Sequence, residues 1–521
     1  MNHIELFAGC GGLNLGLMDS GFKLLMANEI SPMAAETFSF NFFDENLLES
    51  PQTSEHTLWI SSNFPREEMN KRLREDPRTY PDKGGVCDIY ENGKNLKGSL
   101  VVGNIITLNG WLKKNPEALA RVKDGFGSGG VDLISGGPPC QSFSLAGLRE
   151  KNNEKNQLPW AFAEFAKMVQ PKVVLLENVS GILRPFVEKG TKYYAWFEVA
   201  KSFVDIGYIP LTLHINAKFV GVAQNRPRFI LIGVREDLFS KLKDTLNAEE
   251  RRLFASSEKF FEKVRGGAIV SVEDLTVHDL NSEDRTVQEE FTKSFLAPLF
   301  SHKAKFVSVA EAIGDLGEDR AEASAFVRKL NKRFNHYLRH SWKFDQSHRI
   351  ILNQDRVKRR FRLYQVLEKV DCYVKRDIGA VLSGKKTEIS DTSWQSLKNY
   401  EFLQEDGNFS VFRSKESFEA FLMHHLTKKQ IQRALVAEDP APAALSIPDD
   451  ACHYQELRTL TAREMARIQS FPDNFIFRSK MTTGGQSRRF EVPIYTQIGN
   501  AVPVLLGQAL GECVKALITR L

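Results

Sequence analysis

The sequence lacks several features that would assign a class of protein at once. It has six cysteines in 521 residues and no CxxC pair, which argues against a disulfide framework and against a zinc site. No uninterrupted apolar run approaches the roughly 18 residues of a membrane-spanning helix, and no basic start is followed by an apolar segment. We therefore expect a cytoplasmic protein with reduced thiols, without a metal and without a membrane.

Internal repeats and low-complexity tracts are absent as well. The formal net charge is only +5, too small to indicate a partner on its own. A chain of 521 residues can hold two or three domains. The position of charged and reactive residues along the chain is therefore more informative than its composition.

The first part of the chain alternates between apolar runs and stretches with helical spacing. Strands are predicted at His3–Phe7, Leu24–Glu29, Val131–Gly137, Lys172–Asn178 and Phe229–Val234. Because parallel neighbours need crossover connections, this order predicts an α/β fold with a mostly parallel sheet and helices on both faces. Ligands of such sheets bind beyond the carboxyl ends of the strands, where the unusual residues of this sequence lie.

The segment FAGCGG, Phe7–Gly12, follows the first predicted strand and precedes a helix. Its glycines allow a sharp turn and close approach of a ligand to the backbone. Asn14 replaces the third glycine of the dinucleotide fingerprint, so that class of cofactor is not favoured. Glu29 ends the second strand, where a carboxylate can accept hydrogen bonds from ribose hydroxyls. The combination predicts a nucleoside-bearing cofactor, and a solvated strand end is the alternative for Glu29.

Cys140 follows two glycines and two prolines at the end of the third predicted strand. A thiol held on such a rigid turn is a candidate nucleophile, and a buried packing cysteine is the alternative. Glu177 ends the next strand, where it is expected to lie near Cys140 and to donate a proton. Arg226 and Arg228 of QNRPR are expected to present guanidinium groups at the same edge.

The segment from Phe326 to Tyr364 contains twelve Lys or Arg and two acidic residues, a local charge of 12 − 2 = +10. Aromatic residues are interleaved with these charges, as in surfaces that bind nucleic-acid phosphates. A solvated charged helix is the alternative interpretation. The densest part, DRVKRRFRLYQ, predicts a helix whose candidate DNA contacts are Arg356, Lys358, Arg359, Arg360 and Arg362.

Six segments, in order, resemble the motif series of the DNA cytosine-5 methyltransferases. They are FAGCGG, GGPPCQSFS, ENV, QNRPR, RTLTAREMARIQSFPDNF and YTQIGNAVPVLLGQALG, with a variable block between the fourth and the fifth. The resemblance implies a Rossmann-like class I methyltransferase sheet and a smaller, mixed target-recognition domain. We expect a catalytic domain at 1–238, completed by 485–521, and a recognition domain at 239–484 that includes Arg458–Phe475.

The resemblance also implies the chemistry, which is methylation of carbon 5 of a cytosine flipped out of double-stranded DNA. Cys140 would add to carbon 6, Glu177 would hold a proton at ring nitrogen 3, and Arg228 would bind the cytosine carbonyl. Arg226 would assist near the thiolate. Pro138 would accept from the exocyclic amino group through its backbone carbonyl. In the loop after Cys140, the residues expected to contact DNA are Gln141 and Ser144.

The implied methyl donor is S-adenosylmethionine. The residues expected around it are Phe7, Gly9, Gly11, Gly12, Glu29, Asn104, Ile105, Pro138, Asn500 and Val502. Asn104 stands where the family usually has aspartate, but an amide oxygen still accepts a hydrogen bond. The polar stretch Asp44–Lys97 is longer than the corresponding family loops and is interpreted as a surface insertion without a catalytic role.

Two other functions remain open from the sequence. One is a tRNA cytosine-5 methyltransferase, which the large variable block disfavours. The other is a catalytically silent DNA-binding relative, which the presence of Cys140, Glu177 and Arg228 disfavours. We expect a monomer that acts on double-stranded DNA, either beside a restriction endonuclease that recognises the same site without forming a stable complex or as an orphan enzyme.

Overall fold

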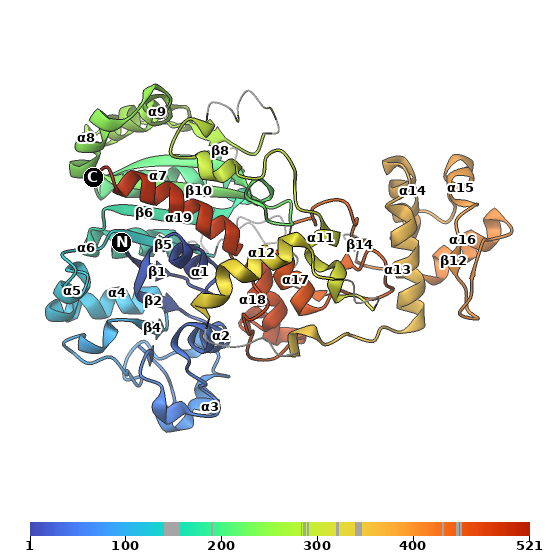
Figure 1. The fold of residues 1–521 in the computed structure, drawn as a ribbon, viewed down its shortest axis with the longest axis horizontal. Coiled ribbons are helices and arrows are strands. Elements are labelled where there is room, and N and C mark those ends of the chain that lie inside the picture. The colour runs from blue at the N-terminus through green and yellow to red at the C-terminus, as the bar shows by residue number, and fades with distance from the viewer. Residues whose placement is uncertain are drawn as a thin grey trace.

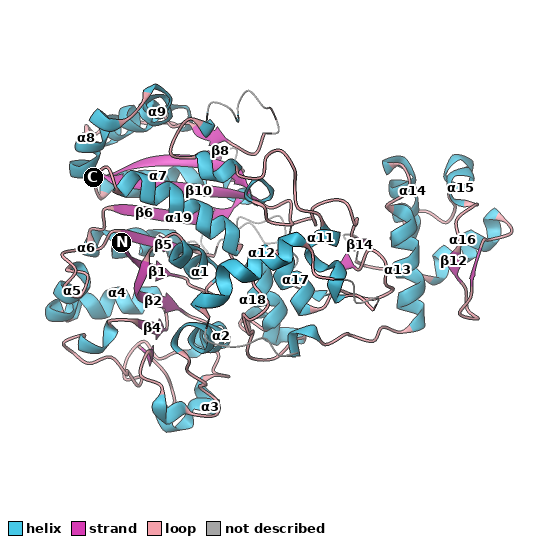
Figure 2. Cartoon of the chain, in the orientation of Figure 1, coloured by secondary structure: helices cyan, strands magenta, loops and turns pink. Residues whose placement is uncertain are grey.

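The computed structural model describes residues 1–139, 157–188, 191–282, 284, 288, 291–318, 322–338, 346–429, 432–443, 447–448 and 451–521. Cys140, Gln141 and Ser144 lie outside these residues, so what the sequence predicts for them stays a prediction. The centre of the structure is a nine-stranded sheet in the order β11-β9-β10-β6-β5-β1-β2-β4-β3. Helices cover both of its faces (Figure 2), and the predicted α/β fold with a Rossmann-like methyltransferase sheet is confirmed.

The five predicted strands are all present, with ends shifted by one or two residues. They are β1 (Asn2–Leu6), β2 (Lys23–Glu29), β5 (Leu133–Gly136), β6 (Val173–Val179) and β10 (Pro227–Arg235). Four further strands complete the sheet, namely β3 (Thr57–Trp59), β4 (Ser99–Val102), β9 (Tyr208–Asn216) and β11 (Val277–Asp279). Strand β10 runs antiparallel to both β6 and β9, because the short connection from Asn216 to Pro227 leaves no room for a crossover helix.

Several long helices pack on this sheet and on one another. They are α1 (Gly12–Asp19), α2 (Pro32–Phe43), α4 (Ile105–Lys114), α6 (Leu158–Val169), α7 (Ala195–Asp205), α8 (Glu236–Thr245), α9 (Ala248–Arg265) and α19 (Val504–Ile518). The last helix returns to the first, since a Cβ at Gly16 would lie 2.5 Å from the Val504 carbonyl oxygen. The two ends of the chain therefore form one layer of the same domain.

Helices further along the chain form two smaller groups (Figure 1). One surrounds α17 (Ala462–Ile468) and includes α11 (Val309–Ile313), α12 (Ala325–Phe334) and α18 (Ile494–Asn500). The other, here called the distal bundle, has its own apolar core and projects away from the sheet. It consists of α13 (Asp355–Leu367), α14 (Cys372–Leu382), α15 (Asp391–Leu397), α16 (Lys415–His424) and the hairpin β12–β13 (Phe402–Leu403 and Phe409–Ser410).

The domain boundary expected after residue 238 falls inside the large core. Strand β11 pairs with β9, and apolar side chains from Phe239 to Phe300 belong to the same buried cluster as the central strands. We therefore keep the two-domain division as a proposal, with the catalytic part extended to about Phe300. Within the described ranges no single helix is long and apolar enough to cross a membrane, although Gly485–Asn500 and Val504–Ile518 pass that test together across a 68° bend.

Candidate methyltransferase site

The glycine turn after β1 is held by the carboxylate of Glu29. Phe7 and Gly9 both have φ of 56°, a left-handed conformation that is costly for phenylalanine and easy for glycine. The Gly9 N–H donates to Glu29 Oε2 at 2.8 Å, and the Ser31 N–H donates to Oε1 at 2.8 Å. Burial raises the pKa of Glu29, and these backbone donors partly oppose the rise. Because Glu29 is 8% exposed, it is not a solvated strand end.

The first and last motifs meet at Gly12. A Cβ on Gly12 would lie 2.4 Å from the Val502 carbonyl oxygen, and one on Gly11 would lie 2.2 Å from the Phe42 ring. A Cβ on Gly9 would have no neighbour within 4 Å among the described residues, so the turn is open on that side. The structure therefore brings Val502 to the glycine turn and leaves space beside Gly9. The side chain of Asn500, two residues earlier, is exposed.

The residues that follow β4 have roles that the sequence did not indicate. The side-chain oxygen of Asn104 accepts from the Ile106 N–H at 2.9 Å and caps helix α4. Ile105 is 1% exposed and belongs to the large core, whereas Ile106 is 43% exposed. Of the two isoleucines, Ile106 presents the accessible apolar surface. Helical spacing of Ile105 with Leu108 and Leu112 could have identified the buried one.

Glu177 and Arg228 form an ion pair at the end of β6 and the start of β10. Arg228 Nε lies 2.7 Å from Glu177 Oε1, with side chains only 10% and 12% exposed. Burial lowers the pKa of Arg228, and Glu177 opposes that effect. A Cβ on Gly137 would lie 2.9 Å from Glu177 Oε2. The pair therefore lies against the turn that leads to Cys140, as expected from the pairing of β5 with β6.

The same turn is held by Asn178, whose role the sequence reasoning missed. Its side-chain N–H donates to the Pro138 carbonyl at 3.0 Å, and its oxygen accepts from the Val179 N–H at 2.8 Å. A carbonyl oxygen has two lone pairs, so Pro138 can accept a second hydrogen bond. The position of Asn178 directly after Glu177 at a strand end was the signal available in the sequence.

Arg226 is directed at the last motif. Its Nη2 donates to the carbonyls of Gly499 at 2.9 Å and Ala501 at 3.0 Å. It is 2% exposed, and burial, followed by repulsion from Arg228, lowers its pKa. Among the described residues, the side chain of Arg226 donates hydrogen bonds to this loop and to Gln224. These contacts let Arg226 position the 499–501 loop, and its assistance near the thiolate stays a prediction.

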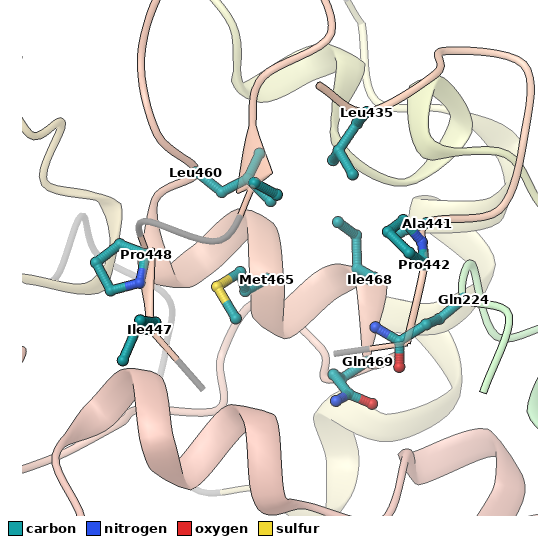
Figure 3. Close-up of a pocket in the computed structure, with 11 residues that line it drawn as sticks. Gln224, Leu435, Ala441, Pro442, Ile447, Pro448, Leu460, Met465, Ile468 and Gln469 are labelled. Atoms are coloured by element: carbon teal, nitrogen blue, oxygen red, sulfur yellow. The ribbon is translucent and has the colours of Figure 1, made fainter. Parts of the chain in front are cut away.

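The QNRPR segment is also fastened to the part of the chain around α17. The Asn225 N–H donates to the Ala441 carbonyl at 2.7 Å, and the Ala441 N–H donates to the Ala223 carbonyl at 2.9 Å. A mostly apolar pocket lies beside this junction, with Gln224 and Gln469 near each other on one side (Figure 3). The residues before β10 are thus positioned by segments that pack with the group around α17.

The predicted basic helix exists as α13, but most of its cations also make contacts within the distal bundle. Those contacts are Arg356 with the His424 carbonyl, Lys358 with Asp355, Arg359 with Glu405, and Arg362 with the Glu401 carbonyl. In the part of the chain that the structure describes, Arg360 Nε has no hydrogen-bond partner. Helix α13 is therefore the support of the hairpin and of α16 as well as a basic element.

The sheet order, the antiparallel β10 and the glycine turn together define the Rossmann-like methyltransferase class. A family model of C-5 cytosine-specific DNA methylases matches residues 1–68 and 118–516. The chain belongs to this family and is a DNA cytosine methyltransferase. The described residues contain no cluster of three or more histidine, cysteine or acidic side chains suited to a metal ion.

Curated relatives match along the whole chain. The chain is similar to the type II methyltransferase M.DdeI of Desulfomicrobium norvegicum, at 25% identity over 98% of this chain and 88% of the relative. It is also similar to M1.HphI of Haemophilus parahaemolyticus, at 24% identity over 100% of this chain and 88% of that protein. A solved DNA modification methyltransferase from an E. coli prophage has a TM-score of 0.49 at 18% identity, covering 100% of this chain and 99% of that one.

Proposed function

We propose that the protein transfers a methyl group from S-adenosylmethionine to carbon 5 of a cytosine extruded from a specific double-stranded DNA sequence. The observation that carries the proposal is the adjacency of two turns at one sheet edge. Strand β1 pairs with β5, with Leu6 opposite Gly136, so the glycine turn and the turn toward Cys140 leave the sheet side by side. The Glu177–Arg228 ion pair lies against the second turn.

The residues around the first turn fit the proposed cofactor. The open side of Gly9 leaves space for a ligand, and Glu29 offers carboxylate oxygens for ribose hydroxyls. Phe7, Gly11, Gly12 and Val502 would surround the rest of the molecule. When bound, the cofactor supplies an electrophilic methyl group. Asn104 and Asn500 are the other polar residues proposed to contact the cofactor. For an apolar contact we propose Ile106, the exposed neighbour of Ile105.

On the target side, Cys140 would add to carbon 6 of the extruded cytosine, which gives carbon 5 the electron density to attack a methyl group. Glu177 would hold a proton at ring nitrogen 3. Arg228 forms an ion pair with Glu177 through Nε, and its Nη1 donates to the Pro227 carbonyl. The guanidinium carries further N–H groups for the cytosine carbonyl. Loss of the carbon-5 proton would then expel Cys140 and restore the ring.

The experiment is transfer of a labelled methyl group from S-adenosylmethionine to double-stranded DNA, with tRNA as the competing substrate. We expect labelled DNA, no labelled tRNA, and no product with Cys140→Ser. A covalent complex with DNA that contains 5-fluorocytosine would support the proposed adduct. Bisulfite sequencing of DNA from cells that express the protein would give the target sequence. Labelled tRNA alone, or activity retained by Cys140→Ser, would refute the proposal.

We further propose that the distal bundle contacts DNA through its basic helix, and that the enzyme acts as a monomer. The support is the concentration of Arg356, Lys358, Arg359, Arg360 and Arg362 on α13. The relatives named above are type II methyltransferases, which favours a role in protecting host DNA from an endonuclease with the same target. Protection of expressing-cell DNA against digestion, after the site is known, tests that role.

A further inference from the structure

The hairpin β12–β13 of the distal bundle is anchored at its base and exposed at its tip. Phe402 is buried, and its ring centroid lies 5.5 Å from that of Phe412 in the apolar core of the bundle. Between these two anchors, every residue from 405 to 411 is exposed. The hairpin therefore projects from the bundle as a short two-stranded ribbon.

The tip carries a phenylalanine that the core of the bundle does not cover. Phe409 lies opposite Leu403 in the strand pair and is 49% exposed. Val411, two residues further along the chain, is 46% exposed. The tip thus offers an aromatic ring and an aliphatic side chain to a partner.

Arginines of α13 lie beside this hairpin. The guanidinium carbon of Arg362 lies 5.4 Å from the centroid of the Phe409 ring. Arg359, one helical turn earlier, donates to Glu405 Oε1 at 2.8 Å, and Arg356, a further turn away, is exposed. Arginines therefore line α13 from the exposed ring toward the start of the helix.

The charges of the two elements differ in sign. Helix α13 has five cations and one acidic residue, a local charge of 5 − 1 = +4, whereas residues 401–413 have one cation and three acidic residues, a local charge of 1 − 3 = −2. The acidic residues of the hairpin disfavour contact with phosphates. In protein–DNA complexes, phosphate contacts position the protein and contacts to base edges give the specificity. The arrangement fits α13 on the phosphates and the hairpin on the bases.

We propose that the hairpin β12–β13 enters the major groove of the target DNA and that Phe409 contacts the methyl group of a thymine there. The major groove admits a two-stranded ribbon, and an apolar side chain can distinguish thymine by its methyl group. The inference rests on the proposed function, because it assumes that α13 binds DNA beside the hairpin. It makes Phe409 a residue that determines sequence specificity.

The test removes the two partners of this contact one at a time. Once the target sequence is known, each of its thymines is replaced in turn by uracil, which lacks only the methyl group, and kcat/KM is measured for each duplex. For the wild type, one of these replacements should lower kcat/KM about three- to fivefold. Phe409→Ala should have a lower kcat/KM on the thymine duplex and should not respond to uracil at that position.

The matched control is Tyr373→Ala on α14, because Tyr373 is exposed to a similar extent, at 47%. This variant should respond to uracil as the wild type does. The dependence of DNA binding on salt gives a second comparison. Phe409→Ala should keep the wild-type salt slope because it removes no charge, whereas Arg356→Ala should reduce the slope by about one. The Tm and the Kd for S-adenosylmethionine should not change in Phe409→Ala.

Three results would overturn the inference. The first is a target sequence without thymine, or a wild-type enzyme that responds to uracil at no position. The second is a Phe409→Ala protein that responds to uracil as the wild type does. The third is a Phe409→Ala protein with a lower Tm that binds all duplexes equally less well, since Phe409 would then only hold Arg362. Failure of the wild type to methylate double-stranded DNA at all would instead refute the proposed function.

Discussion

Replacing Glu5 with glutamine is expected to stabilise the protein increasingly as the pH rises. Glu5 lies in β1 and is 1% exposed, and its Oε2 has no hydrogen-bond partner among the described residues. Ser135 lies opposite Glu5 on β5, and its hydroxyl also has no hydrogen-bond partner among the described residues. Burial raises the pKa of Glu5 well above its ordinary value, and the charge of Glu29 raises it further. The folded protein therefore keeps a proton on Glu5 that the unfolded chain releases.

The sign and size follow from this difference in protonation. Above the unfolded pKa of 4.5, the folded state binds one more proton than the unfolded state, so the free energy of unfolding falls as the pH rises. The slope is about 1.4 kcal/mol per pH unit until the folded pKa is reached. As the pH rises from 5 toward 7, the wild type should lose stability that Glu5→Gln does not lose.

The assay is denaturant unfolding of both proteins at pH 5, 6 and 7. The free energy of unfolding is obtained from the change in circular dichroism at each pH. Burial lowers the pKa of His3 to about 3, so His3 destabilises the fold as the pH falls below 6.5, in the opposite direction to Glu5. His3 is present in both proteins and its contribution cancels in their difference. A difference that stays constant with pH, or a less stable Glu5→Gln protein at pH 7, would refute the assignment of a protonated Glu5.

Three further substitutions test the site and the DNA surface. Arg226→Lys cannot reach both carbonyls of the 499–501 loop and should cost about 2–3 kcal/mol of stability and raise the KM for the cofactor, measured by unfolding and kinetics; an unchanged KM would contradict the positioning role. Gly12→Ala puts a methyl group 2.4 Å from the Val502 carbonyl oxygen and should weaken cofactor binding at least about tenfold by calorimetry. Arg360→Ala should weaken DNA binding and reduce its salt slope by about one, and an unchanged slope would remove Arg360 from the DNA surface.

The sequence predicted the strands whose apolar runs are long and lead into a distinctive turn. Strands β1, β2, β5, β6 and β10 are of this kind, because burial on both faces requires continuous apolar residues. Strands β3 and β11 have only three residues each. Their extended conformation is stabilised by pairing with a longer neighbouring strand. Pairing with a distant segment leaves no periodic pattern in so short a stretch.

The residue types of the site could also be predicted, but their orientations could not. Glu177 lies near the end of β6 and Arg228 at the start of β10, and they meet at one edge because β10 runs antiparallel to β6, a direction that the predicted, mostly parallel sheet did not include. Arg226 is two residues from Arg228 and turns instead toward Gly499 and Ala501. That choice depends on a loop about 270 residues further along the chain, whose proximity only the fold determines.

The burial of residues within the insertion Asp44–Lys97 could not be predicted for a related reason. Its polar composition is typical of a surface loop, yet Arg72 is fully buried and bound to Asp88 at 2.6 Å. Composition cannot predict a buried ion pair, because an arginine or an aspartate taken alone is expected at the surface. The pair joins two parts of the insertion that are 16 residues apart in the sequence.

The sheet register accounts for the way one site can serve two substrates. The glycine turn, where we propose that the cofactor binds, follows β1, and the turn toward Cys140 follows β5. These strands are direct neighbours through Leu6 and Gly136. The close approach of the two strands requires glycine at position 136, because a Cβ there would lie 2.3 Å from the Leu6 carbonyl oxygen. Adjacent parallel strands are separated by less than about 5 Å. Under the proposed function, a methyl donor on one turn and a base held by the other would therefore meet without any rearrangement of the sheet.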